Sequence, residues 1–341
     1  MPGNTKGALR NTAILLLISG LFGCDPHEPM GTALPDQNLD GPSTSSDDVN
    51  GLSALATPLQ QDVALVSLGK KLFEDPRLSG DNTVSCATCH VVAAGGDDGR
   101  PVSIGVGGAS GTHNAPTVLN SGLNFRQFWD GRAKDLDEQV EGPIHNPLEM
   151  NTKWQDIIPK LQSDADMVAA FKASHLSITQ ANVIKAIVAY ENALVTLDSP
   201  FDRYLKGDES AISNEAKKGL DLFVRLGCVS CHQGQNVGGN MYQRFGVFKN
   251  YYEDEGRVSE IALGRYNVTG NPDDKYVFKV PSLRNVTQTA PYFHDGSVAS
   301  LEGAINIMAT YQLGRSLEEA DVTSIIAFLE TLTGDLDESL K

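Results

Sequence analysis

Two stretches of the chain have apolar residues at the spacing of an amphipathic helix. The first is made of Val183, Ile184, Ile187, Tyr190 and Leu194. The second is made of Val322, Ile325, Ile326, Leu329 and Leu332. Steps of three and four residues place such side chains on one face of a helix. Ser177-x-x-Gln180 and Ser316-x-x-Glu319 are candidate capping boxes for the two helices, and Gly334 is placed to end the second one.

The rest of the chain has little regular pattern. Long segments such as 95–120 and 234–281 are rich in Gly, Asn and Pro, which favour turns and loops. No run of alternating apolar residues is long enough to be a convincing strand. The pattern therefore predicts a mainly α protein with long loops. Loops of this length are unusual unless something other than an ordinary core holds them.

One unit of sequence occurs twice. Gly69-Lys-Lys-Leu72-Phe73 precedes Cys86-Ala-Thr-Cys89-His90, and Gly219-Leu-Asp-Leu222-Phe223 precedes Cys228-Val-Ser-Cys231-His232. Each copy ends in one of the two predicted helices. A chain of 341 residues exceeds the usual size of one domain. We therefore expect two domains, at residues 57–199 and 200–341, with the boundary near Ser199-Pro200.

The first residues have the features of an export signal. Lys6 and Arg10 supply positive charge, and residues 13–22 form an apolar stretch too short to span a bilayer as a helix. Leu21-Phe22-Gly23-Cys24 is similar to the lipobox of bacterial lipoproteins. These features predict a signal peptide at residues 1–23 and a periplasmic protein attached to the membrane through a lipid on Cys24. The alternative is an ordinary secretory signal with Cys24 unmodified.

Composition adds a predicted tether and one excluded class of partner. Residues 24–56 are dense in Pro, Gly, Ser, Asp and Asn with few large apolar side chains, so we expect a disordered tether that cannot offset its chain entropy. The net charge of −16 argues against binding to nucleic acid, which relies on clustered Lys and Arg. A basic or neutral partner is favoured instead.

The repeated Cys-x-x-Cys-His motif indicates covalent haem. In this motif the two thiols form thioethers with the porphyrin and the adjacent imidazole binds the iron. The alternatives are a dithiol redox site and a zinc site of four thiolates. Neither alternative needs the histidines, and with 7 His in 341 residues their chance placement after both pairs has a probability of about 0.0004. We predict two c-type haems, which would also give the long loops a surface to pack on.

The chain from about Leu68 to Gly334 resembles the bacterial dihaem cytochrome c peroxidases, a family with a branch that oxidises side chains of other proteins. The resemblance is based on ordered segments at compatible spacing. They are Leu72-Phe-Glu-Asp-Pro-Arg-Leu-Ser79, Asn114-Ala-Pro-Thr-Val-Leu-Asn120, Gln127-Phe-Trp-Asp-Gly-Arg-Ala133, Gly142-Pro-Ile-His-Asn-Pro-Leu-Glu-Met150, Val280-Pro-Ser-Leu-Arg-Asn-Val286, Ala290-Pro-Tyr-Phe-His-Asp-Gly296 and Met308-Ala-Thr-Tyr-Gln-Leu-Gly314. The resemblance implies two cytochrome c-like domains, each built around one haem.

The resemblance also implies an activity. Members reduce hydrogen peroxide to water with two electrons from a small periplasmic cytochrome c or copper protein, and many pair as homodimers. The haem on Cys86, Cys89 and His90 would be the peroxide site. The haem on Cys228, Cys231 and His232 would accept electrons from the donor.

Several single residues match functional positions of the family. Glu149 matches the distal carboxylate that moves the peroxide proton, and Gln139 matches the distal amide. Trp129 matches the tryptophan that lies between the haems. Without the resemblance, Glu149 would be interpreted as a solvated surface acid and Trp129 as a core residue.

Further matches concern the second haem and a metal ion. Met308 matches the thioether ligand opposite His232, although by residue type alone it would be helix core. Asn114, Thr289 and Pro291 match positions that bind calcium through one side-chain oxygen and backbone carbonyls; local turn structure is the alternative. His294, within Tyr292-Phe-His-Asp-Gly296, is interpreted as a conformational or a propionate-binding residue.

The chain departs from the family at one position. Many members have a histidine 16 residues after the first haem histidine that caps the iron in the oxidised state, and Val106 occupies this place. We therefore expect an open first haem that needs no reductive activation, unless His113 substitutes. The protein-oxidising branch also lacks the cap but can have tyrosine where Met308 stands. Peroxidase activity is the favoured interpretation; the alternatives are oxidation of a partner protein and simple electron transfer.

Overall fold

The computed structural model describes residues 48–57 and 61–341, which belong to one compact unit. The predicted signal peptide, Cys24 and the tether up to residue 47 lie outside the described residues. None of the helices within the described ranges is long and apolar enough to cross a membrane.

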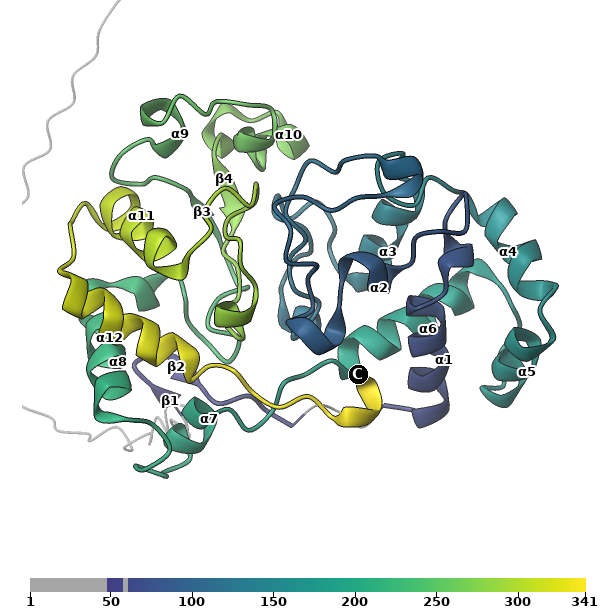
Figure 1. Cartoon of the computed structure of the whole chain (residues 1–341), viewed down its shortest axis with the longest axis horizontal. Helices are drawn as coiled ribbons and strands as arrows, with labels where there is room; N and C mark the ends of the chain where they lie inside the picture. Colours follow the sequence, from purple (N-terminus) through teal and green to yellow (C-terminus); the bar gives the residue numbers. More distant parts are fainter. Residues whose placement is uncertain (1–47, 58–60) are drawn as a thin grey trace, which may run out of the picture. The chain divides into compact units, whose positions relative to one another are not determined.

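The described chain is mainly α-helical with long loops, as predicted, and falls into two halves (Figure 1). The helices of the first half are α1 (Val63–Phe73), α2 (Cys86–Cys89), α3 (Leu136–His145), α4 (Trp154–Gln162), α5 (Ala165–Ala173) and α6 (Gln180–Ala193). Those of the second are α7 (Pro200–Leu205), α8 (Asn214–Leu226), α9 (Tyr251–Asp254), α10 (Tyr266–Thr269), α11 (Leu301–Leu313) and α12 (Glu319–Glu330).

Short strands and 3-10 turns complete the fold. Strands β1 (Asp48–Val49) and β2 (Leu52–Ser53) form one antiparallel pair, and β3 (Tyr242–Arg244) and β4 (Val277–Lys279) form another with Tyr242 opposite Lys279. The 3-10 turns are Pro76–Leu78, Val92–Ala94, Val106–Gly108, Ser121–Leu123, Cys228–Ser230, Ile261–Leu263, Pro272–Asp274, Val286–Gln288 and Glu338–Leu340. The segment predicted as a loop at 234–281 therefore contains β3, β4, α9 and α10.

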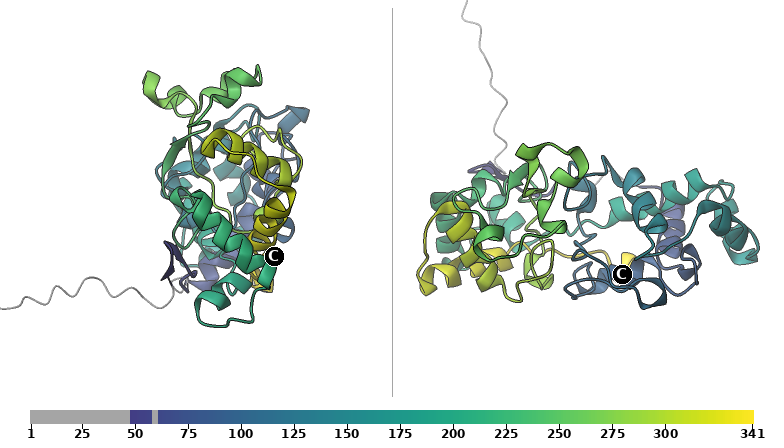
Figure 2. Two further views of the ribbon diagram at one scale, coloured as in Figure 1. Left: turned by 90° about the vertical axis from the view of Figure 1, so that its left-hand side faces the viewer. Right: turned by 90° about the horizontal axis from the view of Figure 1, so that it is seen from above.

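Each half is organised by one crossing pair of helices. Helix α1 packs on α6 in the first half (Figure 1). Helix α8 packs on α12 in the second half, which faces the viewer in the left view of Figure 2. The repeated glycines are the points of closest approach. A Cβ on Gly69 would clash with the backbone carbonyl of Ala186, and a Cβ on Gly219 with that of Ser324. The sequence repeat is thus a repeat of structure.

The predicted helix ends need correction. Helix α6 is capped by Thr179, whose hydroxyl accepts from the Asn182 N–H, so the capping box at Ser177 is wrong. Helix α12 begins after Glu318 with no side-chain cap, so the box at Ser316 is wrong as well. Helix α12 also ends before Gly334. That glycine is needed because the Thr196 and Leu197 carbonyls lie against it.

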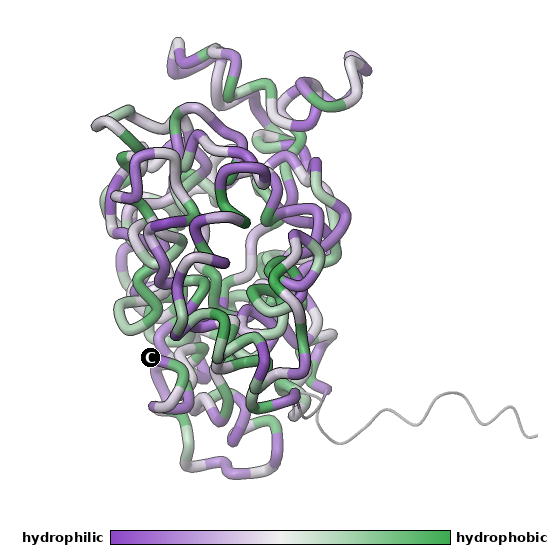
Figure 3. Tube along the Cα trace, turned by 90° about the vertical axis from the view of Figure 1, so that its right-hand side faces the viewer, coloured by the Kyte–Doolittle hydropathy of each residue, from purple (hydrophilic) through white to green (hydrophobic). Residues whose placement is uncertain are grey.

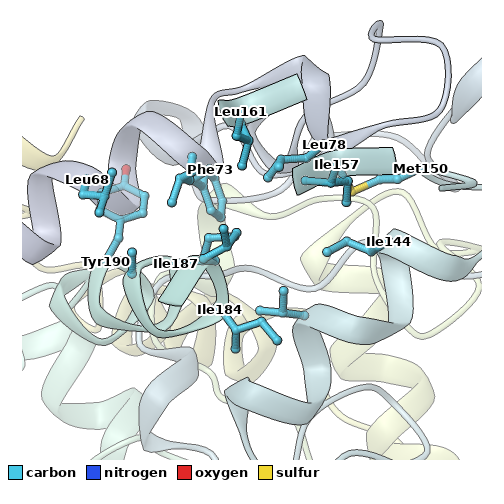
Figure 4. Packing of buried hydrophobic residues seen from close by; sticks show 14 of the residues in the cluster. Leu68, Phe73, Leu78, Ile144, Met150, Ile157, Leu161, Ile184, Ile187 and Tyr190 are labelled. Atoms are coloured by element: carbon cyan, nitrogen blue, oxygen red, sulfur yellow. The ribbon is translucent and has the colours of Figure 1, made fainter. Parts of the chain in front are cut away.

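The hydrophobic core of the first half lies between α1, α3, α4 and α6. Its buried residues include Leu68, Phe73, Ile144, Ile187 and Tyr190 (Figure 4). The second half has a corresponding core around Phe201, Phe223 and Phe328. Coloured by hydropathy, the trace is hydrophilic along many of the outer loops and hydrophobic along many inner segments (Figure 3).

The segments at the two ends of the described chain pack on the opposite halves. Leu52 has no exposed surface in the core of the second half, and the Leu55 N–H donates to the Asp202 carboxylate at 3.0 Å. The prediction of a disordered tether is therefore wrong for residues 48–56. At the other end, Leu336 belongs to the core of the first half, and the Tyr190 hydroxyl donates to the Leu340 carbonyl at 2.6 Å.

Candidate active site

Two large cavities, one for each Cys-x-x-Cys-His motif, are the prominent features of the described chain. The first has a volume of about 1630 Å³, including the part that is open to solvent, and is lined by Cys86, Cys89 and His90. The second has a volume of about 1800 Å³, measured in the same way, and is lined by Cys228, Cys231 and His232. The two histidine rings have equivalent neighbours, since Phe73 lies 6.5 Å from His90 and Phe223 lies 6.4 Å from His232 between ring centroids.

Both histidines suit a metal ligand. The His90 Nδ1 lies 3.1 Å from the Gly96 carbonyl, an arrangement that orients the ring and leaves Nε2 for a metal. Burial lowers the pKa of His90, and it lowers the pKa of His232 to about 4. Both rings are therefore neutral at pH 7, the form of imidazole that binds metals.

The thiols do not suit the rival sites. The four cysteines of the two motifs are free, and each pair lines a separate cavity, so they form no common four-thiolate zinc site. Burial raises the pKa of Cys86, and it raises the pKa of Cys228 to about 11. A reactive dithiol site needs a lowered thiol pKa. Largely apolar cavities of this size, each with two thiols and one neutral imidazole, fit a covalently attached haem.

The predicted distal residues line the first cavity. Gln139 projects from α3, and Glu149 follows that helix in the turn beginning at Asn146. The Glu149 carboxylate accepts a hydrogen bond from the Asn146 side-chain amide at 2.5 Å. Burial raises the pKa of Glu149. This carboxyl is thus held in position beside the cavity, and it is not a solvated surface acid.

Trp129 lines both cavities. Its indole N–H donates to the Asn114 carbonyl at 2.9 Å, and its own carbonyl accepts from the Lys279 N–H at 2.8 Å. Phe128 before it has a φ of 67°, an unusual value for a bulky residue that a tight turn imposes. The indole is therefore anchored at the boundary of the two cavities.

A second internal repeat surrounds this tryptophan and was missed from the sequence. Bridges join Gln127 to Ala133 and Tyr292 to Val298, closing two equivalent loops. The φ of Phe293 is 71°, close to the φ of Phe128. His294 comes directly after Phe293, just as Trp129 comes directly after Phe128. The signal was present in the two Phe-x-Asp-Gly sequences. His294 lines the second cavity, is buried, and has no hydrogen-bond partner for Nε2 within the described residues.

The remaining predicted residues lie as follows. Met308, on α11, lines the second cavity together with Asn114, Thr289 and Pro291. The Asn114 side-chain amide donates to the Arg100 carbonyl at 2.9 Å. No cluster of three or more His, Cys, Asp or Glu in the described chain has the geometry of a metal site. A cation here would therefore depend on carbonyl and amide oxygens.

Val106 is not among the residues that line the first cavity. Its side chain packs against the core of the first half, and its N–H donates to the Glu149 carbonyl at 2.9 Å. His113 does line this cavity, and its ring lies 6.3 Å from that of His294. The loop at the missing cap position is thus folded against the backbone of Glu149.

Comparisons with known proteins give the family. The family model described as "Di-haem cytochrome c peroxidase" matches residues 63–210. The chain is 47% identical over 281 residues to the "Cytochrome c551 peroxidase" of Nitrosomonas europaea, a match that covers 82% of this chain and 82% of the relative. This chain belongs to the di-haem cytochrome c peroxidase family. A member of this family carries two haems, and the two cavities of this chain are of a kind that fits them.

Two further matches are consistent with this assignment. The chain is 47% identical over 278 residues to the "Cytochrome c peroxidase Ccp" of Escherichia coli, which covers 81% of this chain but only 59% of the longer relative. The crystal structure of a "MauG-like protein associated with microbial copper homeostasis" has a TM-score of 0.74 and 30% identity, covering 86% of this chain and 96% of that one. The predicted mainly α, cytochrome c-like fold is thus confirmed.

Proposed function

We propose that this protein reduces hydrogen peroxide to water with electrons from a small donor protein. The observation that supports this function best is the convergence of Glu149, Gln139 and Trp129 on the cavity that also contains Cys86, Cys89 and His90. The bound haems would supply the iron that binds peroxide and the reservoir for the two electrons. Water formation consumes two electrons and two protons for each peroxide.

The chain's own residues would handle the protons. The Glu149 carboxylate accepts the proton of the incoming peroxide and returns it to the departing oxygen as water forms. The hydrogen bond from Asn146 holds the carboxylate in place, and burial makes it a stronger base than a solvated glutamate. Gln139 supplies an amide that orients the peroxide, and Trp129 lies where electrons would cross between the cavities.

The second cavity would hold the haem that accepts electrons. His232 and Met308 are its proposed iron ligands, and a thioether ligand favours the reduced state needed to store an electron. Asn114, Thr289 and Pro291 are the proposed calcium ligands, with waters completing the shell. Export by residues 1–23, a lipid on Cys24 and a homodimer remain parts of this proposal.

Steady-state kinetics test the proposal directly. The holoprotein is mixed with peroxide and a reduced small cytochrome c or copper protein, and oxidation of the donor is followed. Turnover that saturates with peroxide is expected. Negligible turnover despite two bound haems would contradict peroxidase function.

Val106 favours a second candidate, the oxidation of side chains in a partner protein. A side chain that cannot bind iron leaves the first haem open, so we expect a five-coordinate or water-bound form even in the fully oxidised protein. Electron paramagnetic resonance of the oxidised protein tests this: a fully low-spin, bis-histidine signal at the first haem would refute the open site. A long-lived oxidised species after peroxide addition, without donor turnover, would favour this candidate.

A further inference from the structure

Helix α6 presents one acidic side chain to the first cavity. Ile187 and Glu191, which is one helical turn later, both line this cavity. Ile187 and Tyr190 of the same helix also face α1 (Figure 4). Glu191 is only 5% exposed, and its Oε2 has no hydrogen-bond partner within the described residues. A buried carboxyl without a partner is uncommon in folded proteins because its desolvation is costly.

The charged group that acts on Glu191 is Asp137 on α3, and Cys86 on α2 and the adjacent Tyr190 are the other titratable groups near it. Glu74, at the end of α1, acts on Tyr190. Arg132 also lines the cavity, but its charge acts on Glu149 and not on Glu191. Glu191 takes part in none of the ion pairs of the described chain. Burial, with a smaller contribution from Asp137, raises the pKa of Glu191 to about 8. The carboxyl is therefore neutral at pH 7 and ionises in mildly alkaline solution.

The internal repeat shows that this acid is specific to one cavity. The close contacts of Gly69 with Ala186 and of Gly219 with Ser324 align α6 with α12. In this alignment Ile187 corresponds to Ile325, and Glu191 corresponds to Leu329. Ile325 and Leu329 line the second cavity. Two equivalent helices thus present a carboxyl to one cavity and an isobutyl group to the other.

We propose that Glu191 is the group that binds a proton when the first haem is reduced. An electron added to a cavity of low dielectric is costly unless a positive charge arrives with it. Above about pH 8 the Glu191 carboxylate takes one proton from solvent for each electron that a donor adds, forming one O–H bond, so the charge of the cavity stays constant. Leu329 provides no such group, so the second haem lacks this coupling.

The inference rests on haem occupancy of the first cavity, which is part of the proposed function, but it does not depend on peroxide turnover. The test is a mediated spectroelectrochemical titration of both haems in the holoprotein between pH 6 and pH 10. We expect the potential of the first haem to be constant below about pH 7 and to fall with increasing pH above about pH 8.

Variants make the test specific. Glu191→Gln should abolish the pH dependence of the potential of the first haem and leave the second haem unchanged. Glu191→Leu, which introduces the residue that the second cavity has at this place, should do the same. The control Glu74→Gln removes a carboxylate of the same helix pair outside the cavity, and the pH dependence should remain. An unchanged slope in both Glu191 variants would overturn the proposal.

An infrared measurement covers the case in which the variants fail to fold. The reduced-minus-oxidised difference spectrum of the wild-type protein at pH 9 should contain the C=O stretch of a newly protonated carboxylic acid. Its absence would also overturn the proposal. Failure of the proposed function can be distinguished from failure of this inference. If the protein is not a peroxidase, the donor is not oxidised although the potential of the first haem still depends on pH. If the protein binds no haem, neither potential can be measured.

Discussion

Two glutamates of the first cavity differ in their surroundings, and the difference separates their chemistry. Burial raises the pKa of both Glu149 and Glu191. Glu149 accepts a hydrogen bond from Asn146, which stabilises its ionised form, whereas no described residue donates a hydrogen bond to the Oε2 of Glu191. Glu149 is thus suited to exchange a proton quickly with a substrate, and Glu191 to hold one.

At the residue scale, we predict that Glu149→Gln lowers kcat/KM for peroxide by about 10²- to 10⁴-fold, the usual contribution of a general acid–base group. The visible spectrum of both haems should be unchanged. In the wild type the base must be ionised, so activity should fall as pH decreases through a pKa above that of a free glutamate. Stopped-flow measurements over a pH series check both expectations.

The control for this prediction is Glu138→Gln on the same helix, α3. Glu138 is exposed, and its carboxylate accepts from the Lys134 N–H outside the cavity. This variant should keep wild-type kinetics. Equal losses in the two variants would mean that Glu149 acts only through the stability of α3.

The sequence identified these two acids unequally. Glu149 was found because it lies in a segment that matches a family. Glu191 was missed, although it interrupts an apolar face made of Ile184, Ile187 and Leu194, where the second copy has Leu329. An acid on an apolar helical face is a signal, but only the fold shows that this face borders a cavity as well as a core.

At the scale of elements, the helix crossings depend on single glycines. Gly69→Ala and Gly219→Ala each place a methyl group against a carbonyl oxygen of the crossing helix. We predict a loss of about 1–3 kcal/mol or more in the free energy of unfolding for each. Gly69→Ala should shift the spectrum of the first haem and Gly219→Ala that of the second. Urea denaturation and absorption spectra check this.

Gly303→Ala in α11 is the matched control, since its added methyl would meet only side-chain atoms of Val298 and Ser300, which can move. It should be neutral or slightly stabilising, because alanine is the better helix former. If all three variants behaved alike, close approach of the helix backbones would not be the reason for the repeated glycines.

A buried ion pair joins the first described segment to the second half. Arg284 and Asp202 are both fully buried and are joined by two hydrogen bonds of 2.8 and 2.9 Å. The same guanidinium donates to the Ser53 carbonyl at 3.3 Å. One side chain thus connects β2, α7 and the loop before α11.

We predict that Arg284→Met costs about 3–5 kcal/mol in the free energy of unfolding, because it leaves the Asp202 carboxylate buried without a counter-ion. The double variant Arg284→Met/Asp202→Leu should lose less than the single one. The exposed pair Arg225–Asp221 is the control, and Arg225→Met should cost about 0–1 kcal/mol. Additive losses in the double variant would rule out the ion pair as the cause.

At the scale of the whole molecule, the two halves exchange segments. Residues 48–56 pack on the second half, and Leu336 and Leu340 pack on the first. The Leu197 and Asp335 backbones are also hydrogen-bonded to each other, at 2.7 and 2.9 Å. Because each half holds part of the chain from the other end, we expect the halves to unfold together.

Deletion of residues 337–341 tests this expectation. It removes the hydrogen bond from Tyr190 to the Leu340 carbonyl and the apolar contact of Leu340. We predict one calorimetric transition for the holoprotein and a separate, lower transition for the first half in the deleted variant. Tyr190→Phe, which removes only the hydrogen bond, should keep a single transition. Two transitions already in the wild type would contradict cooperative unfolding.

The sequence by itself determined the mainly α fold, the repeat, the two Cys-x-x-Cys-His sites and the segments that identify the family, because these depend on local periodicity and short spacing. Tertiary structure decided the helix caps, the packing of residues 48–56, the equivalence of the Trp129 and His294 loops and the place of Glu191 beside a cavity. Each of these depends on contacts between residues far apart in the chain, and local patterns do not encode which surfaces meet.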